Sequence, residues 1–159
     1  SIFTLPNLQV LSVARNQLKG SLAQEVSSLV NLRILDLSSN FFGGSIPESI
    51  GEMTSLVELR LNTNAVPNGP FFGFSGSIPT TIGLLDNLVR FDVFENLLTG
   101  VLPTELGYLD KLEILDVALN TNLTGSIPAQ FESLASLREM YIGGTDIGGT
   151  VPSGLCQMQ

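Results

Sequence analysis

The sequence repeats itself at a nearly constant interval, and this periodicity restricts the fold more than any other feature of the chain. Each of six units opens with a leucine, and the openings lie 24 or 25 residues apart except for one interval of 32. The opening leucines are Leu8, Leu32, Leu56, Leu88, Leu112 and Leu137. In the second unit the pattern reads Leu32-x-x-Leu35-x-Leu37-x-x-Asn40-x-Phe42-x-Gly44-x-Ile46-Pro47. A repeat of this length predicts a solenoid, in which every unit buries its flanks against neighbouring units.

This pattern resembles the plant-type leucine-rich repeat, and its Gly-x-Ile-Pro half distinguishes that subtype from other leucine-rich repeats. The resemblance implies an α/β solenoid, a right-handed leucine-rich repeat superhelix. Each turn would add a short strand to a parallel concave β-sheet, a short second strand near Gly-x-Ile-Pro, and a 3₁₀ or helical turn on the convex side. The spacing of Leu35 and Leu37 agrees with a strand, because alternate side chains of a strand point the same way.

A single array of repeats accounts for the whole chain. Residues 1–7 are expected to form the tail of a preceding unit, followed by units at 8–31, 32–55, 56–87, 88–111, 112–136 and an incomplete 137–159. Neither end has the polar composition of a solenoid cap, so we expect a piece of a longer array, with neighbouring repeats or subunits at both ends. The third unit holds eight extra residues between Asn64 and Gly76, and the fifth holds one between Asn120 and Leu123.

An asparagine recurs at the bend after each predicted strand. Its side-chain amide can pair with backbone groups, whereas a buried amide without partners would be costly. We therefore expect a buried structural column made of Asn16, Asn40, Asn64, Asn96 and Asn120. Thr145 replaces the asparagine in the sixth unit, so that unit should be less tightly closed. The glycine of Gly-x-Ile-Pro should occupy a tight bend, and the proline should end the second strand.

The composition excludes several kinds of chemistry. The chain has no His and one Cys, so it cannot form a Ser-His or Cys-His catalytic pair, a His-based zinc site or an internal disulfide. A Gly-rich phosphate loop and a nucleophile elbow are also absent. We therefore expect no enzymatic activity, no cofactor and no metal site. The net charge of −8 argues against nucleic-acid binding. No apolar run approaches the ~20 residues of a membrane-spanning helix, so we expect no membrane insertion by this segment.

The resemblance also implies a function, a non-enzymatic recognition module. Such arrays occur in plant receptor-like kinases, receptor-like proteins and secreted enzyme inhibitors. The chain would then be a segment of an extracellular or cell-surface ectodomain that binds a protein or peptide through its concave or lateral face. The alternative is a structural role, as a leucine-rich repeat scaffold subunit of a larger cell-surface or membrane-associated assembly.

The outward positions of the predicted concave strands supply the candidate ligand site. The first unit presents only the small or uncharged side chains of Val10, Ser12 and Ala14, whereas later units present charges and aromatic rings. Exposed aromatics beside charges are typical of recognition surfaces. We expect a ligand patch made of Glu58, Arg60, Arg90, Asp92, Phe94, Asp116 and Tyr141. The surplus of Asp and Glu predicts a protein or peptide ligand with basic groups.

The same charges have a structural alternative. Neighbouring strands lie about 4.8 Å apart, so Arg60 would stand between Asp36 and Asp92. The pairs would then be surface ion pairs, each worth up to about 1 kcal/mol. Asp92 and Asp116 alone offer too few oxygen atoms for Ca²⁺, which takes about six to eight.

The insertion of the third unit is rich in phenylalanine. The loop carries Phe71, Phe72 and Phe74 between Gly and Pro residues. These rings either pack over the edge of the solenoid as local core or form a lateral apolar patch for a partner.

Two further positions have alternative interpretations. Asn122-Leu123-Thr124 is the only N-x-[ST] sequon, and Asn122 is either glycosylated, if the protein is secreted, or unused. Cys156 is either a half-buried thiol or, as the resemblance implies, the first Cys of a C-terminal cap with its partner beyond this segment.

Overall fold

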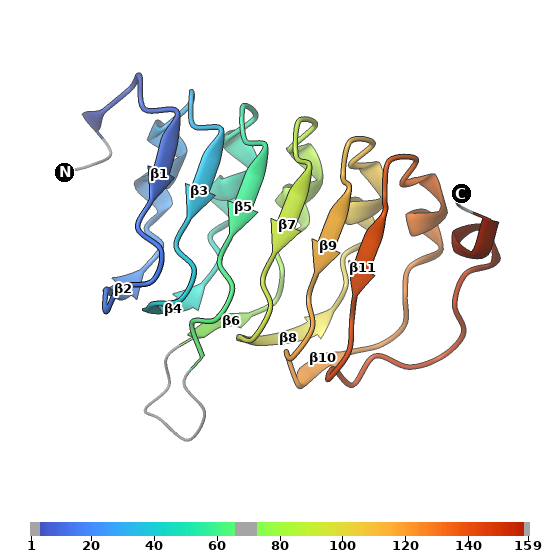
Figure 1. The fold of residues 1–159 in the computed structure, drawn as a ribbon. Helices are drawn as coiled ribbons and strands as arrows, with labels where there is room; N and C mark the ends of the chain where they lie inside the picture. Colours follow the sequence, from blue (N-terminus) through green and yellow to red (C-terminus); the bar gives the residue numbers. More distant parts are fainter. Residues whose placement is uncertain (1–3, 66–72, 158–159) are drawn as a thin grey trace.

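The computed structural model describes residues 4–65 and 73–157, and within them the chain winds into the expected solenoid. In Figure 1 one broad sheet runs along the front, the 3₁₀ turns lie behind it, and a second row of short strands follows the lower edge. The two termini lie at opposite ends of the array. The first five turns therefore contribute one element to each of three sides, and the sixth contributes to the inner sheet and the convex side.

The inner sheet has six parallel strands in the order β1-β3-β5-β7-β9-β11. They are β1 (Val10–Ser12), β3 (Ile34–Asp36), β5 (Glu58–Arg60), β7 (Arg90–Asp92), β9 (Ile114–Asp116) and β11 (Glu139–Tyr141). The register aligns the outward columns as the repeat predicts. One such column is Val10, Ile34, Glu58, Arg90, Ile114 and Glu139. The middle residue of each strand points inward and joins the core, as Leu59 and Phe91 do.

The second sheet has five parallel strands in the order β10-β8-β6-β4-β2. They are β2 (Lys19–Ser21), β4 (Phe41–Ser45), β6 (Gly73–Gly76), β8 (Leu97–Val101) and β10 (Asn122–Thr124). The glycine at the bend has positive φ in all six units, between 74° and 127°, as the tight bend requires. In the part of the sixth unit that the structure describes, only an isolated bridge from Gly148 to Ser126 continues this sheet.

The convex side consists of short 3₁₀ helices, one per turn. They are η2 (Gln24–Ser28), η3 (Glu48–Glu52), η4 (Thr80–Leu84), η5 (Thr104–Tyr108), η6 (Ala129–Ser133) and η7 (Ser153–Gln157). From η3 to η6 the N-cap is the proline that ends the second strand, in extended conformation. Proline fits this place because it lacks a backbone N–H and its φ is already restricted.

Glycines let adjacent convex turns approach each other closely. A Cβ atom on Gly51, Gly83 or Gly107 would lie 2.5–2.6 Å from a backbone carbonyl oxygen in the next turn. Real Cβ atoms do not come so near to other heavy atoms. The convex turns can therefore pack backbone against backbone only where this position has no side chain.

The core is a continuous column of aliphatic and aromatic side chains. Phe74, Phe91 and Phe131 are fully buried, together with the leucines that open units two to five. Phe74 belongs to β6, directly after the insertion, so it packs in the core rather than forming part of a lateral patch. Phe71 and Phe72 lie outside the described residues.

The asparagine column joins successive turns through their backbones. The side chain of Asn96 donates from Nδ2 to the carbonyl oxygens of Leu61, in the preceding turn, and Val93, at 2.9 and 3.1 Å. Its Oδ1 accepts a hydrogen bond from the N–H of Phe74 at 2.9 Å. The column members from the second to the fifth unit are at most 3% exposed, namely Asn40, Asn64, Asn96 and Asn120. In all four, the buried side-chain amide donates to a carbonyl oxygen of the preceding turn.

The two ends of the column differ from its middle. Asn16 is exposed, and its side-chain Nδ2 donates to the carbonyl oxygens of Val13 and Ala14 in its own turn. Thr145 donates to the carbonyl oxygen of Ile142, also in its own turn, at 2.7 Å. The side chain of Thr145 reaches no preceding turn through a hydrogen bond that the structure describes, whereas the asparagines from the second to the fifth unit each do.

Candidate functional site

The inner sheet brings together the side chains that the sequence singled out. Arg60 and Arg90 are partly exposed, at 38% and 32% of their side chains. Phe94 is half-buried and Tyr141 is 48% exposed. The predicted patch is contiguous in register, because Glu58 pairs with Arg90 and Asp92 pairs with Asp116 across β5, β7 and β9.

The ion pairs of the patch run mainly along single strands. The guanidinium of Arg60 contacts the carboxylate of Glu58, two residues earlier on β5, and lies 3.9 Å from Asp36 on β3. Arg90 pairs with Asp92 on its own strand at 3.0 Å. The expected pairing of Arg60 with Asp36 is present, whereas the pairing of Arg60 with Asp92 is replaced by the bridge from Arg90. Residues two apart on a strand share a face, which makes the same-strand pairs short.

The aspartates of this column also hold the backbone bend that follows each strand. Asp36 accepts from the N–H of Ser38 at 3.0 Å and Asp116 from that of Ala118 at 3.0 Å. In β7, Oδ1 of Asp92 is 3.3 Å from the N–H of Phe94, and Asp92 is only 5% exposed. A carboxylate two residues before an N–H donor is a common turn motif. Asp92 therefore serves the fold, and its assignment to the ligand-contacting surface needs correction.

Asp116 differs from the other two aspartates. No Lys or Arg forms a salt bridge with it among the residues that the structure describes. Burial raises its pKa, and the charge of Asp92 adds to this, while the N–H of Ala118 and the charge of Arg90 act in the opposite direction. Asp116 is thus a partly buried carboxylate whose charge is incompletely compensated.

The far end of the patch is aromatic and acidic. The hydroxyl of Tyr141 donates to Oε2 of Glu139 at 3.2 Å, and the charge of Glu139 raises the pKa of Tyr141. Phe94 stands in the neighbouring column, where the next two turns present Ala118 and Gly143. A Cβ added to Gly143 would meet nothing within 4 Å, so the surface over Gly143 is open.

Outside the inner sheet, the sequon occupies an exposed position. Asn122 and Thr124 of β10 are exposed, while Leu123 between them is fully buried. The extra residue of the fifth unit is accommodated by a turn in which the N–H of Leu123 bonds to the carbonyl oxygen of Asn120 at 3.0 Å. The sequon side chains therefore face solvent on the lateral side.

Three further points of the sequence analysis concern Cys156, metal binding and membrane insertion. Cys156 lies in η7, but its side chain is outside the part of the chain that the structure describes. Among residues 4–65 and 73–157, no group of three or more His, Cys, Asp or Glu residues is arranged to hold a metal ion. Within the same ranges, no helix has the length and apolar character needed to cross a bilayer.

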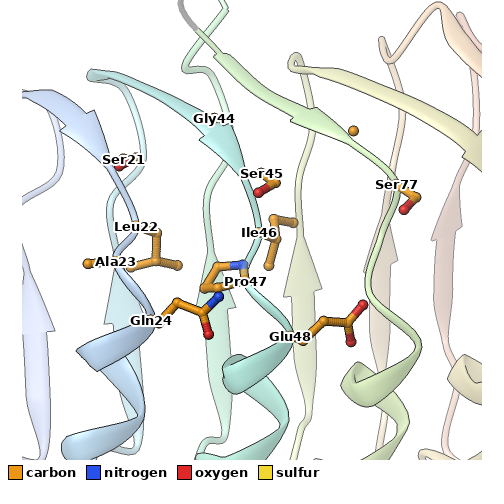
Figure 2. A pocket seen from close by; sticks show the side chains of 11 residues that line it. Ser21, Leu22, Ala23, Gln24, Gly44, Ser45, Ile46, Pro47, Glu48 and Ser77 are labelled. Carbon is orange, nitrogen blue, oxygen red and sulfur yellow. The ribbon is translucent and has the colours of Figure 1, made fainter.

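Sequence reasoning missed a hollow of about 640 Å³ on the lateral side. Figure 2 shows it between the second strands and the 3₁₀ turns, with Ser21, Ser45 and Ser77 on successive turns. Each of these serines follows the bend glycine, a pattern visible in the sequence, whereas the fourth unit has the exposed Val101 there. The lining includes a single ionisable residue, Glu48, so the hollow offers space and hydroxyls rather than charged or aromatic anchors.

Known proteins agree with this architecture. Residues 31–53 match the sequence profile described as Leucine Rich Repeat. No curated protein sequence matches the chain significantly. The leucine-rich repeat ectodomain of the Arabidopsis thaliana membrane receptor kinase GASSHO1/SCHENGEN3, solved with CASPARIAN STRIP INTEGRITY FACTOR 2, is similar over 99% of this chain and 18% of its own. The sequence identity is 31% and the TM-score 0.89.

Two further solved structures show the same likeness. The complex of the Arabidopsis receptor kinase HAESA with the peptide hormone IDA and the co-receptor SERK1 matches 98% of this chain and 25% of the other, with 31% identity and a TM-score of 0.88. The BIR3–SERK2 complex from Arabidopsis thaliana matches 88% of this chain and 69% of the other, with 31% identity and a TM-score of 0.73.

A parallel inner sheet, a second sheet at the Gly-x-Ile-Pro bends and a column of buried asparagines define a plant-type leucine-rich repeat array. The chain belongs to the leucine-rich repeat family. It spans only 18% and 25% of the length of the GASSHO1/SCHENGEN3 and HAESA structures.

Proposed function

We propose that the chain is a recognition segment of an extracellular receptor-like protein, and that it binds a peptide on the inner sheet across units three to six. The observation that carries the proposal is the uneven inner surface. The first strand presents Val10 and Ser12, whereas the later strands present charged and aromatic side chains, with Phe94 and Tyr141 left partly uncovered. The role is one of binding and involves no catalysis.

The similar solved structures support this proposal. The HAESA structure contains a peptide hormone, and it matches nearly the whole of this chain. A likeness of fold alone does not transfer a function. The proposal therefore rests on the fold together with the aromatic and charged side chains that this chain places on its inner sheet.

The geometry suits a short extended segment. Glu58 on β5 and Tyr141 on β11 are three inter-strand spacings apart, and strands lie about 4.8 Å apart, which gives a span of roughly 14 Å. An extended chain rises about 3.3 Å per residue, so about four residues of a ligand would cover the patch. Aromatic side chains provide contact area at low entropic cost, and charges set orientation.

The extracellular compartment is part of the proposal and has its own test. Asn122 and Thr124 are exposed, so an oligosaccharide can be attached at Asn122 without disturbing the core. Mass spectrometry of the native protein should find glycan on Asn122. A bare Asn122 together with a reduced Cys156 would argue for an intracellular origin.

The binding proposal is tested with the 159-residue chain and a displayed library of random 12-residue peptides. Peptides enriched by the wild-type chain are synthesised, and their affinities for variants are measured by fluorescence anisotropy. Tyr141→Ala and Phe94→Ala should each weaken binding about tenfold or more, as for buried aromatic contacts of interfaces.

Tyr108→Ala provides a matched control, because Tyr108 is 62% exposed on the convex helix η5. It should leave affinity unchanged, as should Ser12→Ala on β1. Failure to enrich any peptide, or equal losses for Tyr141→Ala and Tyr108→Ala, would contradict binding on the inner sheet.

A further inference from the structure

The inner sheet carries several charges, but most of them already have a partner in the fold. Arg60 is held by Glu58 and lies near Asp36. Arg90 is held by Asp92, which is nearly buried. Both cations of the patch are therefore balanced by carboxylates of the same surface, and removing any member of these pairs would disturb the fold as well as the surface.

We propose that Asp116 is the residue that selects the ligand of this surface, by receiving a Lys or Arg side chain that runs beside Phe94 and Tyr141. This inference rests on the proposed peptide-binding function and names the chemical class of that peptide. The peptide carries a basic residue in the segment that covers β9, and Asp116 forms the ion pair with it.

The hydrogen bonding of Asp116 leaves room for this contact. Oδ1 accepts from the N–H of Ala118 at 3.0 Å, which fixes the direction of the carboxylate. Oδ2 accepts no hydrogen bond from any residue that the structure describes. An ionised carboxylate has lone pairs for several donors, so Oδ2 is free to accept from an ammonium or guanidinium group.

The neighbours of Asp116 shape the approach to it. Its register partners are Asp92 on β7 and Tyr141 on β11. The carboxylate of Asp92 is paired with Arg90, and the hydroxyl of Tyr141 donates to Glu139. Both neighbours therefore have their polar contacts elsewhere. The neighbouring outward column presents little side-chain bulk beside Asp116, because Ala118 and Gly143 follow Phe94 in that column.

This arrangement matches the shape of a long basic side chain. The aliphatic stem of Lys or Arg can lie over Ala118 against the ring of Phe94, while its charged head reaches Asp116. The face of Tyr141 adds a cation–π contact at the same point. An incoming cation also offsets the cost of holding the Asp116 charge in a partly buried place beside Asp92.

Asp116→Asn separates recognition from folding. Its Oδ1 still accepts from the N–H of Ala118, but the negative charge is gone. Asp86→Asn is the matched control, because it makes the same change of net charge at an exposed position after η4 on the convex side. Urea denaturation of both variants shows that they are folded before binding is measured.

The experiment selects the displayed random 12-residue library separately on the wild type, on Asp116→Asn and on Asp86→Asn. Peptides enriched by the wild type and by Asp86→Asn should contain Lys or Arg at one position, and that preference should vanish with Asp116→Asn. A selected synthetic peptide is then compared with its Lys→norleucine analogue. The analogue should bind the wild type about fivefold more weakly or worse, but should bind Asp116→Asn as the parent peptide does.

Each outcome is decisive. If peptides are enriched and require Tyr141 but show no basic preference, or if the norleucine effect is the same in Asp116→Asn, the assignment of Asp116 is wrong while the binding function stands. If the wild type enriches no peptide, the proposed function fails, and the role of Asp116 fails with it. The norleucine comparison within the wild type needs no protein variant, so a misfolded variant cannot hide the answer.

Discussion

The close packing of the convex turns predicts that Gly107→Ala destabilises the protein although it adds one methyl group. A Cβ atom at this position would lie 2.5 Å from the carbonyl oxygen of Gln130 and 2.7 Å from its carbonyl carbon and Cβ. These atoms belong to the start of η6, and backbone cannot move aside as the end of a side chain can. To reach an ordinary contact of about 3.4 Å, η5 and η6 must separate by roughly 0.9 Å.

The magnitude follows from two opposing terms. Overpacking of this kind costs about 1–3 kcal/mol, and the separation also loosens the fully buried Leu106 and Phe131 beside it. The gain from the lower entropy of the unfolded chain is about 0.4–1 kcal/mol. Because the clash is with backbone, we expect a net loss of about 2 kcal/mol in the free energy of unfolding, near the upper end of the difference.

Urea denaturation followed by circular dichroism measures this loss. Gly148→Ala is the control, because a Cβ at Gly148 would meet nothing within 4 Å and its φ is not positive. It should change the free energy of unfolding by less than about 0.5 kcal/mol. Equal free energies of unfolding for the two variants would refute the reasoning that close backbone approach requires glycine at the convex turn.

Three further predictions concern the asparagine column and the partly buried aspartate. Asn96→Ala should cost about 1–3 kcal/mol in urea denaturation, because it removes the acceptor of the buried N–H of Phe74 and the hydrogen bond that joins this turn to the carbonyl oxygen of Leu61. Asn16→Ala, which removes only exposed bonds within one turn, should cost under about 1 kcal/mol, and equal costs would contradict the inter-turn role. Thr145→Asn should raise the free energy of unfolding by about 1 kcal/mol, because the longer amide can reach the carbonyl oxygen of Val117 and extend the column into the sixth unit; an unchanged midpoint would show that this unit cannot close. Asp116 has a pKa raised above its ordinary value of 3.8, mainly by burial, so its contribution to stability is present below that value and is lost as the pH rises through the raised pKa. The stability of Asp116→Asn relative to the wild type should therefore increase between about pH 3 and pH 7, as followed by urea denaturation at each pH, and a constant difference would show that burial does not disfavour the charge.

Much of the fold follows from the spacing of the repeat. The register of the inner sheet, the five strands of the second sheet and the buried asparagines all lie where the pattern predicts them. This success has a physical reason, since every unit buries the same positions against its neighbours, and a side chain of the wrong type there would interrupt the whole column. The insertion is the exception, because the pattern alone left its start open and the structure shows that the repeat resumes at Gly73 and Phe74.

The strained bends could not be predicted in the same way. The residue before each column asparagine has positive φ, between 54° and 58°, although its side chain differs from unit to unit. These residues are Arg15, Ser39, Thr63, Glu95 and Leu119. The left-handed conformation is unfavourable for them, most of all for the β-branched Thr63. The hydrogen bonds of the asparagines hold the bend, so its conformation comes from neighbours in space. In the sixth unit the corresponding residue is Gly144, a residue type that favours positive φ. It precedes Thr145, which replaces the column asparagine.

The aspartates of the inner sheet show most clearly why a site is harder to predict than a fold. In the sequence, Asp36, Asp92 and Asp116 occupy the same position of three units and appear equivalent. The three aspartates differ only in the cations near them, and the repeat pattern does not specify those cations. Arg60 lies near the first, Arg90 binds the second, and no cation binds the third among the residues that the structure describes. Each of the three also holds the N–H two residues later, so removing the carboxyl group altogether would confuse folding with recognition. An Asp→Asn exchange keeps that acceptor, and it is informative about a ligand only at Asp116, where no ion pair of the fold is broken by the loss of charge.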